Sequence, residues 1–350
     1  MGPTAVVHWN GSAWAVQPAT TSQNLSTVGG TGPADVWALG GGALLHWDGG
    51  TWANRSTSGP IEDLAAVWGS GPSDVWAAGR SSIRHWDGTA WAALPTSGAP
   101  QGITALWGTA PSDVWAVGWA KTLQHWDGTA WADRSNGFQS ITWTQPNGVW
   151  GSGPNDVWAV GYGNSTQHGI AHWDGSAWVE RSSGLTMNAF NGIWGSGPND
   201  VWAVGPGGVA HWNGTSWAQQ SSGALDLSAV WGTGPHDVWA VGRGAWHWDG
   251  LTWADTLTGT PTDAANTTLL AVWGSGANDV WAVGNGVDTT HGSYQQLGPR
   301  LLHWDGVRWV TLSTMPGAST FGGVWGSGPG DVWAVGGGGV RPGRLLNGGA

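Results

Sequence analysis

Short apolar runs separated by Gly, Pro, Asp and Ser recur along the whole chain, and none is long enough to be a helix. In the stretch that starts near residue 64 the runs are LAAVWGS, DVWAAG, SIRHW and TAWAAL. They are rich in Val, Trp and Leu and are bounded by turn-forming residues, which is the pattern of short β-strands. The sequence therefore predicts an all-β protein with four strands in each group of about 40 residues.

Two motifs mark a repeat. The motif DVWA begins at residues 35, 74, 113, 156, 200, 237, 279 and 331. The motif HW, followed by Asp or Asn and then Gly, begins at residues 8, 46, 85, 125, 172, 211, 247 and 303. Repeat units start near residues 28, 67, 106, 149, 193, 230, 272 and 324. Four strands per unit at this period are typical of a β-propeller blade.

Each end of the chain supplies half a unit. Residues 5–20 have the pattern of third and fourth strands, and the segment from residue 324 has that of first and second strands. Joining the two halves in one blade closes the ring and removes exposed strand edges. The sequence predicts one domain over residues 1–350, an eight-bladed propeller. A seven-bladed ring with a frayed terminal unit is the alternative, because GRLLNGGA at the end resembles another third strand.

Tryptophan occupies the same strand positions in almost every unit. Of the 34 tryptophans, all but Trp119, Trp143 and Trp246 are in register, and Gly29 replaces the first-strand Trp of the first unit. A blade cannot bury its faces alone, and each Trp removes a large apolar area from water. The in-register tryptophans are therefore predicted to pack blade against blade.

The acidic residues fall mainly at turns. The Asp-Gly and Asn-Gly pairs after the third strands predict two-residue type I′ turns, with positive φ at both positions. One such turn offers too few oxygens for calcium, so no metal site is predicted there. The Asp of each DVWA motif is expected to accept hydrogen bonds from turn amides. Both sets lie on one face of the ring, which should be regular, tight and acidic.

The eight histidines of the HW motifs are interpreted as buried, hydrogen-bonded residues. The residue two positions before each His is apolar, so the His shares a packed strand face. Third strands lie about 15 Å or more from the axis, which separates equivalent histidines too far for a shared metal. No metal and no cofactor are predicted.

The opposite face receives loops that differ from unit to unit, and variable loops on a rigid scaffold are a common place for binding groups. Packing within the loops is the alternative interpretation of each aromatic residue and histidine found there. The candidate ligand-binding residues that depart from the repeat pattern are Trp119, Trp143, Tyr162, His168, Trp246, His291 and Tyr294.

Charge and composition exclude several classes of function. The net charge is −11 and no basic cluster occurs, so nucleic acid is not an expected partner. No apolar stretch is long enough to span a membrane, and the N-terminus lacks a signal-peptide pattern. No nucleophile–base pair or phosphate loop is recognisable, so an enzyme is not predicted, although a propeller can assemble a site from distant loops. The chain has no Cys, which fits either redox compartment.

A unit such as LAAVWGSGPSDVWAAGRSSIRHWDGTAWAAL resembles the tectonin repeat of propeller lectins. In that repeat a VW second strand, an aliphatic third strand and a DG…W hairpin recur in the same order. The DGTAW segment is also similar to the Asp-box of sialidase-like propellers. The resemblance implies recognition of glycans at several sites per molecule.

Two functions remain open at this point. The favoured one is a non-catalytic, multivalent carbohydrate-binding propeller, in which weak repeated sites gain by avidity. The alternative is a protein-interaction or structural scaffold, as one module of a larger surface protein. Equivalent sugar sites require the same exposed residues in every blade, whereas a scaffold requires only differing loops. We expect a monomer that is secreted or on the cell surface, with a cytoplasmic location as the alternative.

Overall fold

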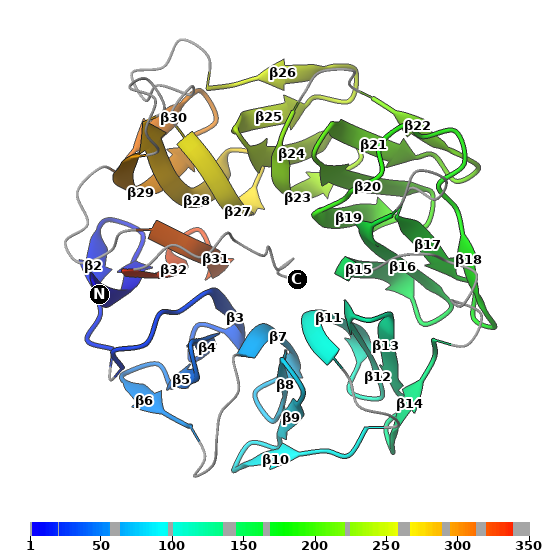
Figure 1. Ribbon diagram of the computed structural model, residues 1–350. Coiled ribbons are helices and arrows are strands. Elements are labelled where there is room, and N and C mark those ends of the chain that lie inside the picture. Colours follow the sequence, from blue (N-terminus) through cyan, green and yellow to red (C-terminus); the bar gives the residue numbers. More distant parts are fainter. Residues whose placement is uncertain are drawn as a thin grey trace.

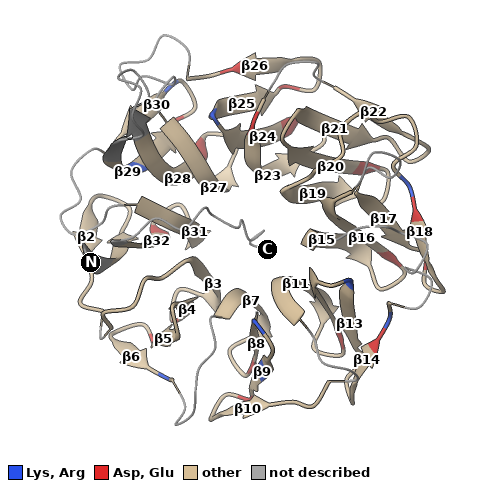
Figure 2. Cartoon of the chain, viewed as in Figure 1, with Lys and Arg blue, Asp and Glu red and all other residues tan. Residues whose placement is uncertain are grey.

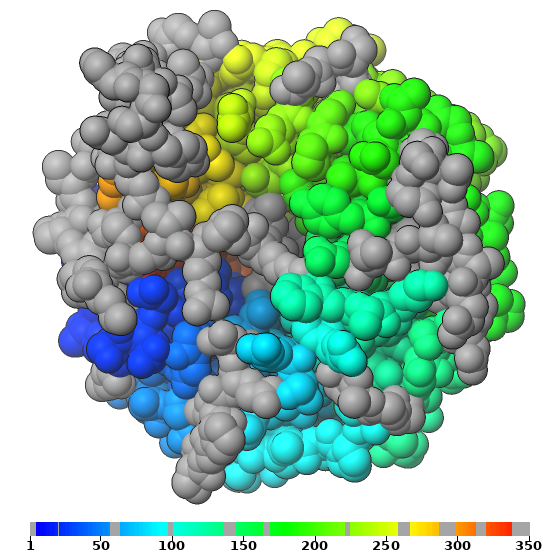
Figure 3. All heavy atoms as spheres, viewed as in Figure 1, coloured from blue at the N-terminus to red at the C-terminus, as the bar shows by residue number. Residues whose placement is uncertain are grey.

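Each predicted group of four strands forms one antiparallel sheet, and eight such sheets surround a central axis (Figure 1). This computed structural model describes residues 2–19, 21–56, 64–96, 101–135, 145–163, 169–220, 225–257, 267–288, 295–312 and 320–338. The eight-bladed β-propeller is confirmed, and the seven-bladed alternative is wrong. The blades follow one another in sequence order around the ring (Figure 3).

The first four blades run through the first half of the chain. Blade 1 contains β3 (Thr27–Gly32), β4 (Asp35–Gly40), β5 (Ala43–Trp47) and β6 (Trp52–Asn54). Blade 2 contains β7 (Leu64–Gly71), β8 (Asp74–Gly79), β9 (Ile83–Trp86) and β10 (Trp91–Ala93). Blade 3 contains β11 (Gln101–Ala110), β12 (Asp113–Trp119), β13 (Thr122–Trp126) and β14 (Trp131–Asp133). Blade 4 contains β15 (Gln145–Gly153), β16 (Asp156–Tyr162), β17 (Ile170–Trp173) and β18 (Trp178–Glu180).

The remaining blades complete the ring. Blade 5 contains β19 (Gly192–Gly197), β20 (Asp200–Gly205), β21 (Gly208–Trp212) and β22 (Trp217–Gln219). Blade 6 contains β23 (Leu227–Gly234), β24 (Asp237–Gly242), β25 (Gly244–Trp248) and β26 (Trp253–Asp255). Blade 7 contains β27 (Thr267–Gly276), β28 (Asp279–Asp288), β29 (Gln295–Trp304) and β30 (Trp309–Thr311). Blade 8 contains β31 (Thr320–Gly328) and β32 (Asp331–Gly338) with β1 (Gly2–Trp9) and β2 (Trp14–Val16). Among the described residues no helix is long and apolar enough to cross a membrane.

Blade 8 is built from both ends of the chain, as the half-units predicted. Its strand order is β2-β1-β32-β31. Val6 pairs with Val335 and His8 pairs with Trp333, so β1 occupies the third-strand place beside β32. The competing segment GRLLNGGA lies outside the described residues. Sharing this blade leaves no gap in the ring and covers the strand edges that an open ring would expose.

The same aromatic cluster joins every pair of neighbouring blades. Trp202 of β20 stacks on His211 of its own blade, with ring centroids 3.9 Å apart. The same Trp202 ring lies 5.3 Å from Trp248 and 5.4 Å from Trp253 of the next blade, by centroid distance. Equivalent contacts occur at all eight interfaces, including the two that flank blade 8. The second-strand tryptophans are at most 1% exposed, so their predicted packing between blades is confirmed: Trp37, Trp76, Trp115, Trp158, Trp202, Trp239, Trp281 and Trp333.

The first-strand tryptophans pack in a second, inner ring. A Cβ added at Gly195 would lie 2.6 Å from the Trp150 ring of the preceding blade. Gly151, Gly232 and Gly274 receive a Trp ring in the same way. The Trp of each such Trp-Gly pair thus packs on the following blade, and its Gly leaves space for the Trp of the preceding blade.

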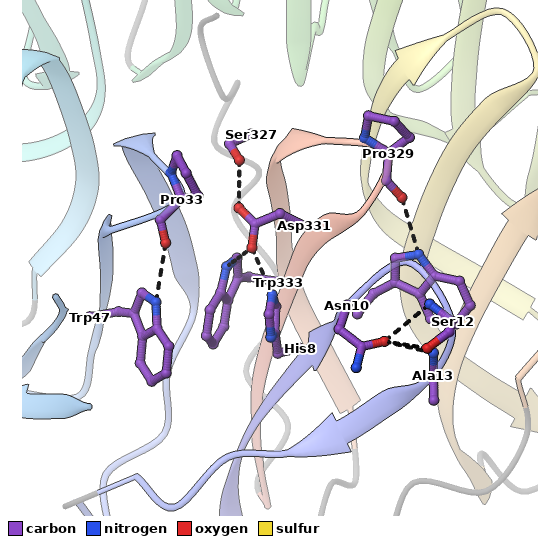
Figure 4. A network of polar contacts seen from close by, with 11 residues as sticks. His8, Asn10, Ser12, Ala13, Pro33, Trp47, Ser327, Pro329, Asp331 and Trp333 are labelled. Atoms are coloured by element: carbon purple, nitrogen blue, oxygen red, sulfur yellow. Dashed lines mark hydrogen bonds and ion pairs between the residues drawn. The ribbon is translucent and has the colours of Figure 1, made fainter. Parts of the chain in front are cut away.

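A carboxylate holds the aromatic cluster in place within each blade, and Figure 4 shows this for Asp331 of blade 8. In blade 8 the Asp331 carboxylate accepts hydrogen bonds from His8 Nε2 at 2.7 Å, Ser327 Oγ at 2.6 Å and Trp333 Nε1 at 3.0 Å. The His and the Ser or Thr bonds occur in all eight blades, and the Trp bond occurs in six. The expectation that turn amides bind this carboxylate was wrong, because side chains brought together by three strands supply the donors. The hydrogen-bonded His interpretation is confirmed, although the rings are partly rather than fully buried.

The hairpins between third and fourth strands differ from the predicted type I′ turn. Trp47 pairs with Trp52, and the Asp48 carboxylate accepts hydrogen bonds from the N–H groups of Gly50 and Thr51. Only the Gly after each Asp or Asn has positive φ, between 89° and 93° in the eight hairpins. The Asp therefore precedes the central residues instead of being one of them, because from that position its carboxylate caps two amides.

We expect Trp202→Ala to lower the free energy of unfolding by about 3 to 5 kcal/mol, because it removes a fully buried ring from a blade interface. The same change at Trp119, which is 45% exposed, should cost about 1 kcal/mol or less. Urea denaturation followed by tryptophan fluorescence measures both. Equal losses for the two variants would contradict the division between interface and surface tryptophans.

Acid should unfold the protein steeply below about pH 4. Burial raises the pKa of the DVWA aspartates, but the His and Ser or Thr hydrogen bonds outweigh it, so each pKa lies below its ordinary value. A lowered folded-state pKa stabilises the fold above the unfolded-state pKa, and this stabilisation is lost as the pH falls through the lowered value. Urea midpoints measured from pH 6 to pH 2.5 test this. A midpoint that does not change over that range would contradict it.

Candidate functional site

The two kinds of loop lie on opposite faces of the ring. Trp47 Nε1 donates a hydrogen bond to the Pro33 carbonyl at 3.2 Å, which joins the third-to-fourth-strand hairpin to the turn between the first and second strands. Equivalent bonds occur in five other blades. We call the face with these hairpins and turns the turn face. The loop face carries the segments that follow the second strands and those that join one blade to the next.

Acidic residues are spread around the whole ring (Figure 2), and most of them belong to the turn face. It carries the eight Asp of the DVWA motifs and six hairpin Asp. In the part of the chain that the structure describes, Arg308 is its one basic residue of the Lys or Arg type, whereas Arg80, Lys121 and Arg243 lie on the loop face. The protein therefore presents one anionic face and one face with mixed charge.

The hairpin carboxylates are occupied by their own turns. At Asp87 and Asp127 a Thr hydroxyl and two backbone N–H groups lower the pKa to about 2. Within the described ranges, no three side chains of His, Cys, Asp or Glu converge as a metal site requires. These carboxylates are thus turn residues that also set the charge of the face.

Two of the candidate residues occupy the same position in adjacent blades on the loop face. Trp119 follows Gly118 at the end of β12, and Tyr162 follows Gly161 at the end of β16. Their side chains are 45% and 39% exposed. The equivalent residues around the ring are Gly41, Arg80, Trp119, Tyr162, Pro206, Arg243, Asn285 and Gly337. Blades 2, 3 and 4 therefore present Arg80, Trp119 and Tyr162 in consecutive order.

Gly102 joins two of these residues. The Trp119 indole lies on Gly102, because a Cβ added there would be 2.8 Å from the ring. The Gly102 N–H donates to the Arg80 carbonyl at 2.6 Å. Gly102 also has φ of +52°, a conformation that favours glycine. Neither Arg80 nor Gly102 was a candidate from the sequence, because their relation to Trp119 depends on how blades 2 and 3 approach.

The turn beside Trp119 is strained. Ala120 and Lys121 have φ of 51° and 64°, and in the described chain they are the two non-glycine residues with positive φ. Gly118 pairs with Thr122 in the flanking strands, so these residues form the tight connection between β12 and β13. Such strain costs about 1 kcal/mol or more per residue and is concentrated at functional sites. The turn places Ala120 and then Lys121 directly after the exposed Trp119.

Side-chain hydrogen bonds also join neighbouring blades, from blade 3 to blade 6. Thr104 Oγ1 donates to the Pro146 carbonyl at 2.8 Å, Asn147 Nδ2 to the Phe190 carbonyl at 2.9 Å, and Asn191 Nδ2 to the Leu227 carbonyl at 2.7 Å. Each donor lies three residues before a first-strand Trp, and each acceptor belongs to the next blade. These bonds link blades 3 to 6 in series.

Trp246 lies in a different environment from the other candidates. It pairs with Ala240 and Asp255 within blade 6, and its partly buried ring packs against a cluster that includes Trp202 and Val209 of blade 5. The residue directly before the HW motif is also apolar in several other units, which is the sequence signal for this packing role. The candidates Trp143, His168, His291 and Tyr294 lie outside the described residues.

The first strands surround a central cavity of about 380 Å³. The described residues that line it include no acidic, basic or histidine side chain. Gly29 interrupts the ring of indoles that lines it, which consists of Trp68, Trp107, Trp150, Trp194, Trp231, Trp273 and Trp325.

Comparison with solved structures finds β-propellers. A structure described as YCF48 bound to D1 peptide has a TM-score of 0.56 and 15% identity, covering 87% of this chain and 97% of that one. The computationally designed Ika8 protein has a TM-score of 0.65 and 16% identity, covering 90% and 96%. The WD40 β-propeller domain of Doa1 has a TM-score of 0.58 and 11% identity, covering 96% and 94%.

This likeness is one of fold. No protein-family model matches the sequence. No curated protein matches it either. The neighbours share the β-propeller fold with this chain, and the tectonin and Asp-box resemblances stay predictions.

We expect the double change Ala120→Asn and Lys121→Gly to raise the free energy of unfolding by about 1 to 2 kcal/mol, because both residues adopt positive φ more readily. Urea denaturation measures the gain. Lys121→Asn alone should give a smaller gain in the same direction. A loss of stability in the double variant would show that the observed turn is not strained.

Proposed function

We propose that the protein is a non-catalytic interaction propeller that binds an acidic segment of a partner protein on the loop face of blades 2 to 4. One observation carries the proposal. The second-strand tryptophans that repeat from blade to blade are buried, while Trp119 and Tyr162, which depart from the repeat, are exposed at one position in adjacent blades beside Arg80.

The chemistry of this sector suits a peptide better than a row of equivalent ligands. Trp, Tyr and Arg are the residues most enriched at the energetic centres of protein interfaces. Arg80 and Lys121 supply positive charge for carboxylates, and the two aromatic rings supply apolar area. The hydrogen bonds between blades keep this surface rigid, so little entropy is lost when a partner binds.

A fold neighbour supports a peptide ligand in general terms. The YCF48 structure is described as bound to D1 peptide, and it shares the propeller architecture with this chain. It supports the use of a propeller for binding a peptide.

A single glycan site is the second candidate function. The Trp119 indole lies flat on the Gly102 backbone and is 45% exposed, an arrangement that also suits the apolar face of a sugar. The multivalent lectin that the sequence pattern favoured needs equivalent exposed aromatic residues in every blade. The second-strand tryptophans are buried, which removes them as repeated sugar platforms.

Parallel screens of peptide and glycan arrays test the two candidates. We expect saturable binding of acidic peptides, weakened about 10-fold or more by Trp119→Ala. Arg80→Glu should also weaken binding, whereas Arg243→Glu, the same change at the equivalent position of blade 6, should not. Binding that survives both Trp119→Ala and Arg80→Glu would overturn the assignment of the site. Hits confined to glycans and lost in Trp119→Ala would favour the second candidate.

A further inference from the structure

The eight hairpins of the turn face can be compared position by position. Two hairpins in adjacent blades differ from the other six in one residue. The residue two positions after the Asp or Asn is small or polar in six blades. In blades 6 and 7 it is Leu251 and Val307. The residues at this position are Ser12, Gly50, Thr89, Thr129, Ser176, Thr215, Leu251 and Val307.

The aliphatic side chains are not needed by the turns that carry them. In five blades the Ser or Thr hydroxyl at this position donates to the hairpin Asp or Asn. Leu251 and Val307 have no hydroxyl to make that bond. Their backbone N–H groups still donate to the hairpin carboxylates, at 2.8 Å to Asp249 and 2.9 Å to Asp305. The hairpin is therefore formed without any contribution from the aliphatic group.

Both side chains are almost wholly exposed. Leu251 is 83% and Val307 is 81% exposed, whereas the next most exposed large apolar side chain in the described chain is Val16 at 50%. A single exposed aliphatic residue is ordinary on a protein surface. Here two occur at one repeat position in neighbouring blades, and the other six blades show that a small or polar residue serves there.

The two hairpins belong to blades in direct contact. Trp239 of blade 6 lies 5.1 Å from Trp304 and 5.4 Å from Trp309, by centroid distance, and these two residues flank the hairpin of Val307. Exposed His236 lies against Gly250 in the hairpin of Leu251. Leu251 and Val307 thus project from neighbouring hairpins on the same face.

Charge decides what kind of partner this surface suits. Asp249 and Asp305 are exposed beside the two aliphatic side chains, and backbone hydrogen bonds hold the pKa of both carboxyls below the ordinary value. Arg308 lies in the same hairpin as Asp305 and offsets its charge, so Asp249 is the stronger anchor for a cation. The remaining turn-face carboxylates add a negative field that repels acidic partners.

We propose that the turn face of blades 6 and 7 docks a basic, amphipathic segment of a partner protein, whose apolar side chains contact Leu251 and Val307 and whose Lys or Arg residues contact the hairpin carboxylates. This surface lies opposite the loop-face sector of blades 2 to 4. The inference is independent of the proposed function, because the two surfaces lie on opposite faces of the ring.

Fluorescence anisotropy with the full chain tests the proposal, with a labelled peptide of alternating Leu and Lys as the probe. The variant Leu251→Thr with Val307→Thr restores the residue type of the other blades, and the hairpin backbone bonds predict that it folds. We expect it to bind the probe about 10-fold more weakly than the wild type. A Ser and Lys peptide should bind both proteins equally and weakly, and binding of the Leu and Lys probe should fall as salt rises.

A matched control moves the apolar pair to another sector. Thr89→Leu with Thr129→Val places the same side chains beside Asp87 and Asp127 in blades 2 and 3. Added to the Thr variant, this pair should restore binding of the probe, because the proposed site consists of the aliphatic pair and the hairpin carboxylates, and a failure to restore it would count against the proposal. Equal binding of the probe by wild type and Thr variant would overturn the proposal, as would equal affinity for a Leu and Glu peptide. A wild-type dimer in light scattering that the Thr variant lacks would also overturn it, because a second copy would then cover the pair.

Discussion

Everything else in the ring depends on the contact between the second-strand Trp of one blade and the paired third- and fourth-strand Trp of the next. The Asp of the DVWA motif makes this contact reproducible, because it fixes the His ring on which the Trp stacks. Burying a carboxylate and an imidazole is costly unless their hydrogen bonds are satisfied, and here three strands supply the partners. Since the same cluster joins blades 7 and 8 and blades 8 and 1, the ring closes without a weaker seam.

This constraint separates the residues that build the ring from those that are free to vary. Positions inside the aromatic cluster are nearly invariant from blade to blade. Each blade can therefore be compared with the other seven, position by position. Trp119 and Tyr162 stand out against Gly, Pro and Asn at equivalent positions, and Leu251 and Val307 stand out against Ser and Thr. Because the two departures lie on opposite faces, the fold offers two surfaces that can change independently.

The sequence was sufficient for the architecture because the repeat period, the turn residues and the complementary chain ends all predicted an eight-bladed propeller. It was insufficient for the polar contacts. The His donor lies 10 to 24 residues after the Asp in seven blades and 323 residues before Asp331 in blade 8, so the pair becomes visible only once the strands are aligned in a sheet. The hairpin prediction failed because Asp-Gly also suits a turn in which Asp caps amides. Of the candidate site, Trp119 and Tyr162 were recognisable as departures from the repeat, whereas Arg80 and Gly102 required the packing of two blades.

Blade 8 also has a consequence for the order in which the protein forms. Its strands come from residues near both ends of the chain, so β1 and β2 have no sheet to join until β32 has been made. Until that moment Trp281 lacks Trp9 and Trp14, and Trp47 and Trp52 lack Trp333. Contacts of such long sequence separation form slowly, because the loop-closure entropy is lost before the contact is gained. Ring closure is then the late step of folding, and a chain still being synthesised carries the β1–β2 hairpin with one strand edge uncovered.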